Sequence, residues 1–201
     1  MNLYTGPLHD IDHQLTDLGA YEWWYVDSLS PDGEWGVVLI QFRGMPMSPQ
    51  YLRSQESGVR SQEGVPSRGA TSIENCGYAV SVYHKGARIA FAFRGVPASR
   101  FSVPGDVWEF DTALPGQSAA IRIHAEVEPS PMQNTGAGND PHSWVLVAPR
   151  TKARVRVELV ERGLVLSEAE WSGLAYRDHN YGSNPMQADF KDWYYICEHT
   201  V

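Results

Sequence analysis

The heptapeptide Arg154-Val155-Arg156-Val157-Glu158-Leu159-Val160 alternates charged and apolar side chains almost without interruption. A period of two residues is that of a β-strand, because successive side chains of a strand point to opposite faces of the sheet. One face of this strand should therefore contact water while the other packs against a core. The heptapeptide predicts a half-buried strand in a sheet.

Strand-like segments of this kind recur along the chain and are separated by turn residues. The turn residues Pro31-Asp32-Gly33-Glu34 join the first two segments into a predicted hairpin. Regularly spaced short strands favour an all-β barrel or sandwich, and an antiparallel barrel closes its own edges. The predicted strands are residues 22–29, 35–42, 75–83, 87–93, 107–110, 119–127, 143–147, 153–160 and 164–171.

Helices and loops take up little of the remaining sequence. Helical periodicity is confined to short stretches at residues 51–55 and 184–191. Residues 53–71 are rich in Ser, Gln, Glu and Gly, and residues 129–140 contain two glycines, so both should be surface loops.

The composition excludes several classes of protein. With 201 residues, 42% of them hydrophobic, the chain can bury a sizeable core. Its formal net charge of −8 would repel a phosphate backbone, which argues against binding to nucleic acid. No apolar run reaches the length of a membrane span, and residues 1–12 lack the pattern of a signal peptide, so we expect a cytoplasmic protein. Cys76 and Cys197 lack metal-ligand spacing and are predicted to be reduced thiols.

The stretch Gly173-Leu174-Ala175-Tyr176-Arg177-Asp178-His179-Asn180-Tyr181-Gly182 concentrates polar groups between apolar segments. Polar groups beside a core need partners, so the stretch is a candidate site. In an extended chain Tyr176 and Asp178 would lie side by side. His179 and Asn180 would project to the other side, or into a turn that ends at Gly182. The alternative is a polar turn capped by Asp178 and Asn180.

Two further motifs carry candidate site residues. Tyr21-Glu22-Trp23-Trp24-Tyr25-Val26-Asp27 places Glu22 and Trp24 on one face of a strand. Glu22 would be either a site residue or half of a buried salt bridge, and Trp24 would either line a pocket or fill a barrel. His142 and Trp144 also share a face, where both could equally be core residues.

Metal and cofactor motifs are missing from the sequence. No phosphate-binding glycine loop, nucleophile elbow, HExxH motif or closely spaced pair of cysteines is present. Asp10, Asp12 and His13 resemble a metal-binding cluster, but near a terminus they are expected to be a solvated tail. We therefore predict neither a metal nor an organic cofactor.

These motifs together resemble the carotenoid 1,2-hydratase (hydroxyneurosporene synthase) family. The resemblance runs collinearly over residues 19–195, and its Glu-Trp-Trp-Tyr and Asp-His-Asn-aromatic-Gly motifs are shared with a wider superfamily of lipocalin-like cyclases and Diels–Alderases. The remaining matching segments are residues 48–51, 141–144, 148–149, 171–173 and 192–194.

The resemblance implies a fold of two lipocalin-like barrels with an apolar pocket. Such a fold would place a first barrel in residues 1–172, and residues 173–201 would form a linker motif and the start of a second β domain. The catalytic residues of the family fall on His142, Trp144, Tyr176 and Asp178. His179 and Tyr181 depart from the hydratase pattern, which has a small polar residue and an acid there, and this points toward the wider superfamily.

The implied reaction is the addition of water to the terminal C1,2 double bond of an acyclic carotenoid or related isoprenoid. An Asp can protonate an alkene only if burial raises its pKa, so Asp178 would be the acid. His142 and Tyr176 would hold Asp178, while Trp144 or Trp24 would stabilise the cation. Glu22, His179 and Asn180 complete the expected substrate-binding set.

The expected partner is a small hydrophobic substrate, reached through peripheral contact with a membrane if it is an isoprenoid. Two alternatives stay open: a cyclase acting on a polyketide-like substrate, and a lipocalin-like module that binds a hydrophobic ligand without turnover.

Overall fold

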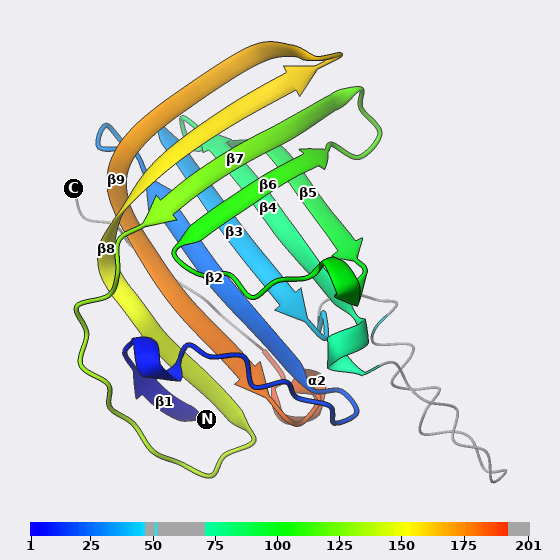
Figure 1. The fold of residues 1–201 in the computed structure, drawn as a ribbon, viewed down its shortest axis with the longest axis vertical. Helices are drawn as coiled ribbons and strands as arrows, with labels where there is room; N and C mark the ends of the chain where they lie inside the picture. Colours follow the sequence, from blue (N-terminus) through cyan, green and yellow to red (C-terminus); the bar gives the residue numbers. More distant parts are fainter. Residues whose placement is uncertain (47–50, 52–70, 193–201) are drawn as a thin grey trace, which may run out of the picture.

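The structure is a computed structural model that describes residues 1–46, 51 and 71–192. Within this part the protein is almost entirely β-structure (Figure 1). The strands are β1 (Asn2–Thr5), β2 (Tyr21–Leu29), β3 (Trp35–Arg43), β4 (Cys76–His84), β5 (Ala87–Val96), β6 (Val107–Ala113), β7 (Ala119–Val127), β8 (His142–Glu161) and β9 (Leu164–Gly182). The short helices are η1 (Pro7–His9), η2 (Ser72–Glu74), η3 (Ala98–Arg100) and α2 (Met186–Asp189).

One sheet holds all of these strands, in the order β5-β4-β3-β2-β9-β8-β7-β6, and β1 pairs in parallel with β8. The sheet curls round on itself into a nearly closed antiparallel barrel (Figure 1). The predicted all-β, lipocalin-like fold is confirmed. The hairpin of β2 and β3 forms as expected, with Leu29 opposite Gly36 at its turn end.

Strands β8 and β9 are longer than predicted. The expected strands at residues 143–147 and 153–160 are one strand, β8, whose register shifts on either side of Ala148. Pro149 lies in that irregular stretch, as expected of a residue that has no N–H for a sheet ladder. Strand β9 continues beyond the predicted end at Trp171, through the whole polar stretch.

The barrel interior is filled by apolar side chains. Large members of this core, among them Trp24, Leu39, Trp108 and Ile121, are completely buried. The alternation of the heptapeptide in β8 follows from this packing, because Val155 and Val157 point inward while Arg154 and Arg156 stay exposed.

A second, smaller apolar cluster lies on the outer face of β2 and β3. It contains Tyr21, Trp23, Phe42 and Met45, together with Met186 from α2. The aromatic-rich motif of β2 therefore serves both faces of the sheet: Trp24 packs inside the barrel and Tyr21 and Trp23 pack outside it.

Three sequence expectations bear on the chain ends. The domain boundary predicted at residues 172 and 173 lies inside β9, which stays paired with β2 from Leu174 to Gly182. Residues 193–201 lie outside the described part, so a second domain stays a prediction. The helix expected at residues 184–191 is shortened to α2, and that expected at 51–55 falls largely outside the described residues.

Two remaining expectations concern membrane spans and thiols. Among the described residues, none of the helices has the length and apolar character that a membrane crossing requires. Cys76 is a buried free thiol, as predicted, and Cys197 lies outside the described residues.

Candidate functional site

The polar motif of β9 is divided between the two faces of the sheet. His179 stands opposite Trp24, which belongs to the interior core, whereas Asp178 stands opposite Tyr25 on the other face. Strand alternation then puts Tyr176, Asp178 and Asn180 on the outer face. The expectation that Asn180 projects away from Asp178 is wrong, because the chain stays extended through Gly182 and makes no turn there.

Three donors surround the carboxyl group of Asp178. The Tyr176 hydroxyl and the Trp144 indole Nε1 both donate to Oδ2, at 2.8 and 3.0 Å. The Asn180 amide donates to Oδ1 at 3.0 Å. Trp144 comes from β8, where it stands opposite Asn180, so two neighbouring strands build the cluster. We call these four residues the outer acid cluster.

Burial dominates the electrostatics of Asp178, whose side chain is 3% exposed. Burial raises the pKa of Asp178 to about 7, although the hydrogen bonds from Tyr176 and Trp144 act in the opposite direction. The charge of Asp27 also raises it. The carboxyl group is therefore poised to carry a proton near neutral pH.

Asp27 was not predicted as a site residue. It lies on β2 directly opposite Tyr176, and it accepts a hydrogen bond from Tyr25 at 3.0 Å. The two carboxylates are thus diagonal neighbours on the outer face. Tyr25 and Asp27 are two positions apart on β2, as Tyr176 and Asp178 are on β9. Only the pairing of β2 with β9 shows that these two pairs of side chains lie side by side.

His142 lies on the same outer face but is bonded elsewhere. Its Nδ1 lies 2.8 Å from the Tyr21 hydroxyl and its Nε2 lies 2.7 Å from Asp189 Oδ2. Gly182 makes this contact possible, because a Cβ there would lie 2.7 Å from the imidazole. Both ring nitrogens are occupied, so the structure does not bring His142 to Asp178 as the resemblance implied.

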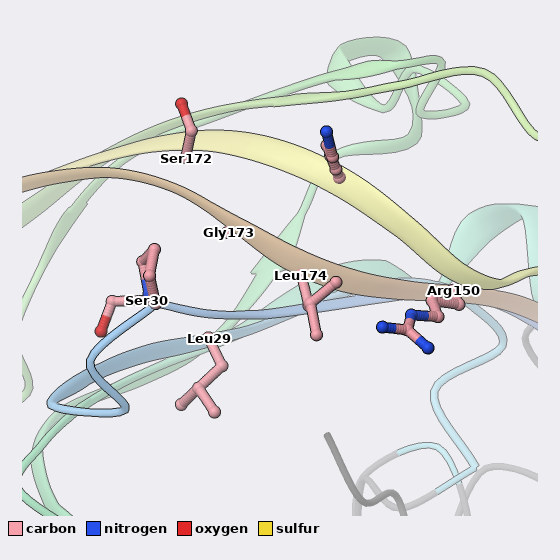
Figure 2. A pocket seen from close by; sticks show the side chains of 8 residues that line it. Leu29, Ser30, Arg150, Ser172, Gly173 and Leu174 are labelled. Atoms are coloured by element: carbon pink, nitrogen blue, oxygen red, sulfur yellow. The ribbon is translucent and has the colours of Figure 1, made fainter. Parts of the chain in front are cut away.

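An apolar pocket lies on the same face of β9 as the outer acid cluster. It has a volume of about 340 Å³ and includes Leu29, Arg150 and Leu174 in its lining. Figure 2 shows the side chains of Leu29 and Leu174 extending to the same side of the ribbon, with Arg150 at one end. Leu174 precedes Tyr176 by two positions, so the pocket and the cluster follow each other along the strand.

Glu22 and His179, predicted as substrate-binding residues, form a different cluster on the inner face. Glu22 Oε1 lies 3.0 Å from His179 Nε2, and His179 Nδ1 lies 3.2 Å from Asp10 Oδ1. Arg177 binds Asp10 Oδ2 at 2.5 Å. Trp24 stacks on His179 with ring centroids 4.6 Å apart. Glu22 thus makes the buried salt bridge that the sequence left open as an alternative.

The N-terminal segment completes this inner cluster. The expectation that Asp10, Asp12 and His13 form a solvated tail is wrong. Asp12 pairs with Arg43 at 2.9 Å, and His13 Nδ1 lies 2.8 Å from Glu22 Oε1. These three N-terminal residues are held in place because charged side chains of β2, β3 and β9 point inward at this end of the barrel. Each of those charges needs a partner.

The charge network also governs protonation at the inner face. Burial alone would raise the pKa of Glu22, but the hydrogen bonds from His13 and His179 lower it to about 2. Burial would lower the pKa of His179, yet its contacts with Asp10 and Glu22 raise it above the ordinary value. Glu22 is therefore ionised, and His179 favours the charged form between two carboxylates.

The eight predicted site residues thus separate into three places. Asp178, Tyr176, Trp144 and Asn180 meet in the outer acid cluster, and His142 bonds Tyr21 and Asp189 nearby. Glu22, His179 and Trp24 lie on the inner face. Trp24 can therefore take no part in chemistry at Asp178.

The fold and this cluster define a class: a lipocalin-like antiparallel barrel that carries a buried, hydrogen-bonded acid on its outer face. Comparison with known proteins agrees. The chain is 30% identical to the acyclic carotenoid 1,2-hydratase of Thiocapsa roseopersicina, over 94% of this chain and 46% of that protein. For the acyclic carotenoid 1,2-hydratase of Rubrivivax gelatinosus the identity is 28%, over 87% and 44%.

A third relative is the hydroxyneurosporene dehydrogenase of Chlorobaculum tepidum, which is 25% identical over 97% of this chain and 58% of that protein. The chain spans about half the length of the curated relatives that it matches. No protein-family model matches it. The resemblance to carotenoid 1,2-hydratases is thereby confirmed along most of the chain.

Proposed function

We propose that this protein is a hydratase that adds water to the terminal double bond of an acyclic carotenoid or related isoprenoid, with Asp178 as the acid. The observation that carries the proposal is the buried carboxyl of Asp178, with a pKa raised to about 7 and donors from Tyr176 and Trp144. The similarity to acyclic carotenoid 1,2-hydratases supports the substrate class.

The hydrogen bonds indicate which oxygen of Asp178 would carry the proton. Both lone pairs of Oδ2 accept bonds, from Tyr176 and from Trp144, so the acidic proton belongs on Oδ1. Asn180 faces Oδ1, and its own Oδ1 has no hydrogen-bond partner in the described part of the chain. A half-turn of that amide would let Asn180 accept the proton's hydrogen bond instead of donating one.

The reaction then balances without another reagent. The π electrons of the alkene take the proton from Asp178 Oδ1, which leaves a carboxylate and a tertiary carbocation. A water oxygen adds to the cation and loses a proton to a carboxylate, which then passes that proton to Asp178 and so restores the acid. We assign the acceptance of the water proton to Asp27, which is the neighbouring carboxylate on the same face.

Trp144 and the pocket supply the remaining requirements. The indole of Trp144 is held beside the acid by its bond to Oδ2, and an aromatic face stabilises a nearby cation. The pocket that contains Leu29 and Leu174 would hold the apolar chain, with the double bond directed past Tyr176 toward Asp178. At about 340 Å³ the pocket would take the end of a long polyene.

The substrate would be drawn from a lipid phase, and one surface of the barrel suits that contact. Three consecutive residues at the β8–β9 turn, Leu164, Val165 and Leu166, are 71%, 48% and 62% exposed. We call them the hairpin tip. Consecutive exposed apolar side chains are unfavourable in water and favourable in a bilayer interface, so we propose that the hairpin tip contacts the membrane peripherally.

Replacing Asp178 by Asn tests the reaction. The purified chain would be incubated with lycopene or neurosporene in liposomes, and products carrying one added water would be quantified by chromatography and mass spectrometry. We expect Asp178→Asn to abolish turnover while the polyene still binds. Asp111→Asn, at an exposed site on β6, is the matched control.

Two results would contradict the proposal. Unchanged hydration by Asp178→Asn would remove Asp178 from the role of acid. Binding without turnover by both the parent chain and the variant would instead identify a ligand-binding barrel. Asp27→Asn should lower turnover and leave binding of the polyene unchanged.

A further inference from the structure

The inner face holds a second arrangement of chemically active groups that the proposed hydration does not use. His13, Glu22 and His179 each offer a ligand atom, and these atoms all lie within 4.8 Å of one another. His13 Nδ1 and His179 Nε2 both point at Glu22 Oε1, at 2.8 and 3.0 Å. Ligand atoms of a tetrahedral Zn²⁺ site lie about 3.3–3.6 Å apart, so modest outward shifts would admit an ion.

An unsatisfied acceptor points to a missing ligand in this cluster. The side chain of Glu22 is 1% exposed, yet within the described residues its Oε2 has no hydrogen-bond partner. Its Oε1, by contrast, is crowded by the His13 backbone N–H and by both imidazoles. A buried carboxylate oxygen normally has a partner, and a cation bound by Glu22 would satisfy Oε2.

The surroundings of His179 match those of a metal ligand. Its Nδ1 lies 3.2 Å from Asp10 Oδ1, an ion-pair distance at which the two atoms do not form a hydrogen bond, while Nε2 faces Glu22 and His13. A carboxylate on the far nitrogen fixes the tautomer and the orientation of metal-bound histidines. Arg177 in turn holds Asp10, and the rings of Trp24 and Tyr181 lie beside His179.

From this geometry we infer that His13, Glu22 and His179 form a binding site for a divalent transition-metal ion such as Zn²⁺. Two imidazoles and one carboxylate are a known ligand set for such ions, with a further position left to water. The site would fasten the N-terminal segment to β2 and β9, because His13 comes from that segment and the other two ligands from the strands. An ion there would displace the protons that the imidazoles share with Glu22.

Metal titration of the full chain tests the inference. After treatment with a chelator, Zn²⁺ binding would be measured by calorimetry and Co²⁺ binding by visible absorption. We expect one ion per chain, a Co²⁺ spectrum with the strong bands of four- or five-coordination, and a higher Tm with Zn²⁺. Asp10→Asn should weaken binding about 10–100-fold.

His13→Gln removes one ligand and is the decisive variant, because His13 is partly exposed and its loss should not unfold the barrel. We expect it to weaken binding at least as much as Asp10→Asn and to abolish the rise in Tm. His124→Gln is the matched control, since His124 also lies between two carboxylates, at 3.2 and 3.1 Å, but on the exposed surface. It should leave binding unchanged.

Three results would overturn the inference. The first is the absence of stoichiometric binding by the parent chain. The second is a Co²⁺ spectrum of the weak octahedral type, which needs no variant to interpret. The third is binding that His13→Gln leaves intact.

Discussion

Replacing Asp178 by Asn should remove a large pH dependence from the stability of the barrel. Burial raises the pKa of Asp178 from its ordinary value of 3.8 to about 7 in the folded chain. Between these two values the unfolded chain has lost the proton and the folded chain still holds it. The folded state then binds more protons than the unfolded state, so the free energy of unfolding falls as the pH rises through this window.

The magnitude follows from the size of the shift. Each pKa unit corresponds to about 1.4 kcal/mol, and a shift of about three units gives about 4 kcal/mol. This contribution is fully present below pH 4 and is lost above pH 7. The asparagine side chain of the variant cannot ionise, and its amide has nearly the shape of the acid. Relative to the parent chain, the free energy of unfolding of Asp178→Asn should therefore rise by about 4 kcal/mol between pH 4 and pH 8.

Urea denaturation monitored by tryptophan fluorescence and circular dichroism measures this difference directly. Both proteins would be unfolded at several pH values from 4 to 8, and their free energies of unfolding subtracted at each pH. Groups that titrate in both proteins and do not interact with Asp178 cancel in the subtraction. Asp111→Asn, exposed on β6, should run parallel to the parent chain. Parallel curves for Asp178→Asn as well would refute the assignment of a proton to Asp178 near neutrality.

Three further predictions concern other parts of the molecule. Trp144→Phe keeps a ring but removes a donor to the carboxylate, so the pKa of Asp178 should rise further and stability at pH 8 should fall by about 1–2 kcal/mol in urea titrations. The pKa of Glu22 is lowered from 4.5 to about 2, so its ion pairs stabilise the fold above pH 4.5 and weaken as the pH falls toward 2. Glu22→Gln should therefore cost about 3 kcal/mol at pH 7 and much less near pH 2.5, which acid denaturation series would show. Leu166→Ser should lower partition into liposomes about tenfold in flotation assays, whereas Leu8→Ser, at a similarly exposed position elsewhere, should not.

The barrel was predictable because its strands alternate. The heptapeptide in β8 and the strand at Ala119–Val127 place apolar residues at every second position, and the hairpin of β2 and β3 has turn residues before an apolar run; each forms as expected. Local patterns do not show how far a strand continues when its residues become polar on both faces. The segment after Asp178, for which the sequence left a turn open as an alternative, is a strand held by pairing with β2 on one side and β8 on the other.

The candidate site was predictable in part. The i, i+2 spacing placed Tyr176 beside Asp178, and the same rule placed His142 and Trp144 on one face. Contacts between strands depend on register, which the sequence does not reveal locally. Because of the observed register, Trp144 contacts Asp178 and Asp27 lies opposite Tyr176. His142 contacts Tyr21 instead of Asp178. The contacts of Asp10 and His13 depend on the path of the N-terminal segment, which has no periodicity.

The two clusters are related through β9, because successive side chains of this strand point to opposite faces of the sheet. Asp178 and His179 are neighbours in sequence, yet one carboxyl is buried and hydrogen-bonded on the outer face and one imidazole is paired between carboxylates on the inner face. The inner cluster fixes β9 against β2 through Glu22, and the same pairing places Asp27 beside Tyr176. A change such as His13→Gln should therefore leave the hydrogen bonds of Asp178 intact, since the two clusters lie on opposite faces of β9. The polar motif of β9 therefore contributes to two separate clusters, one on each face of the strand.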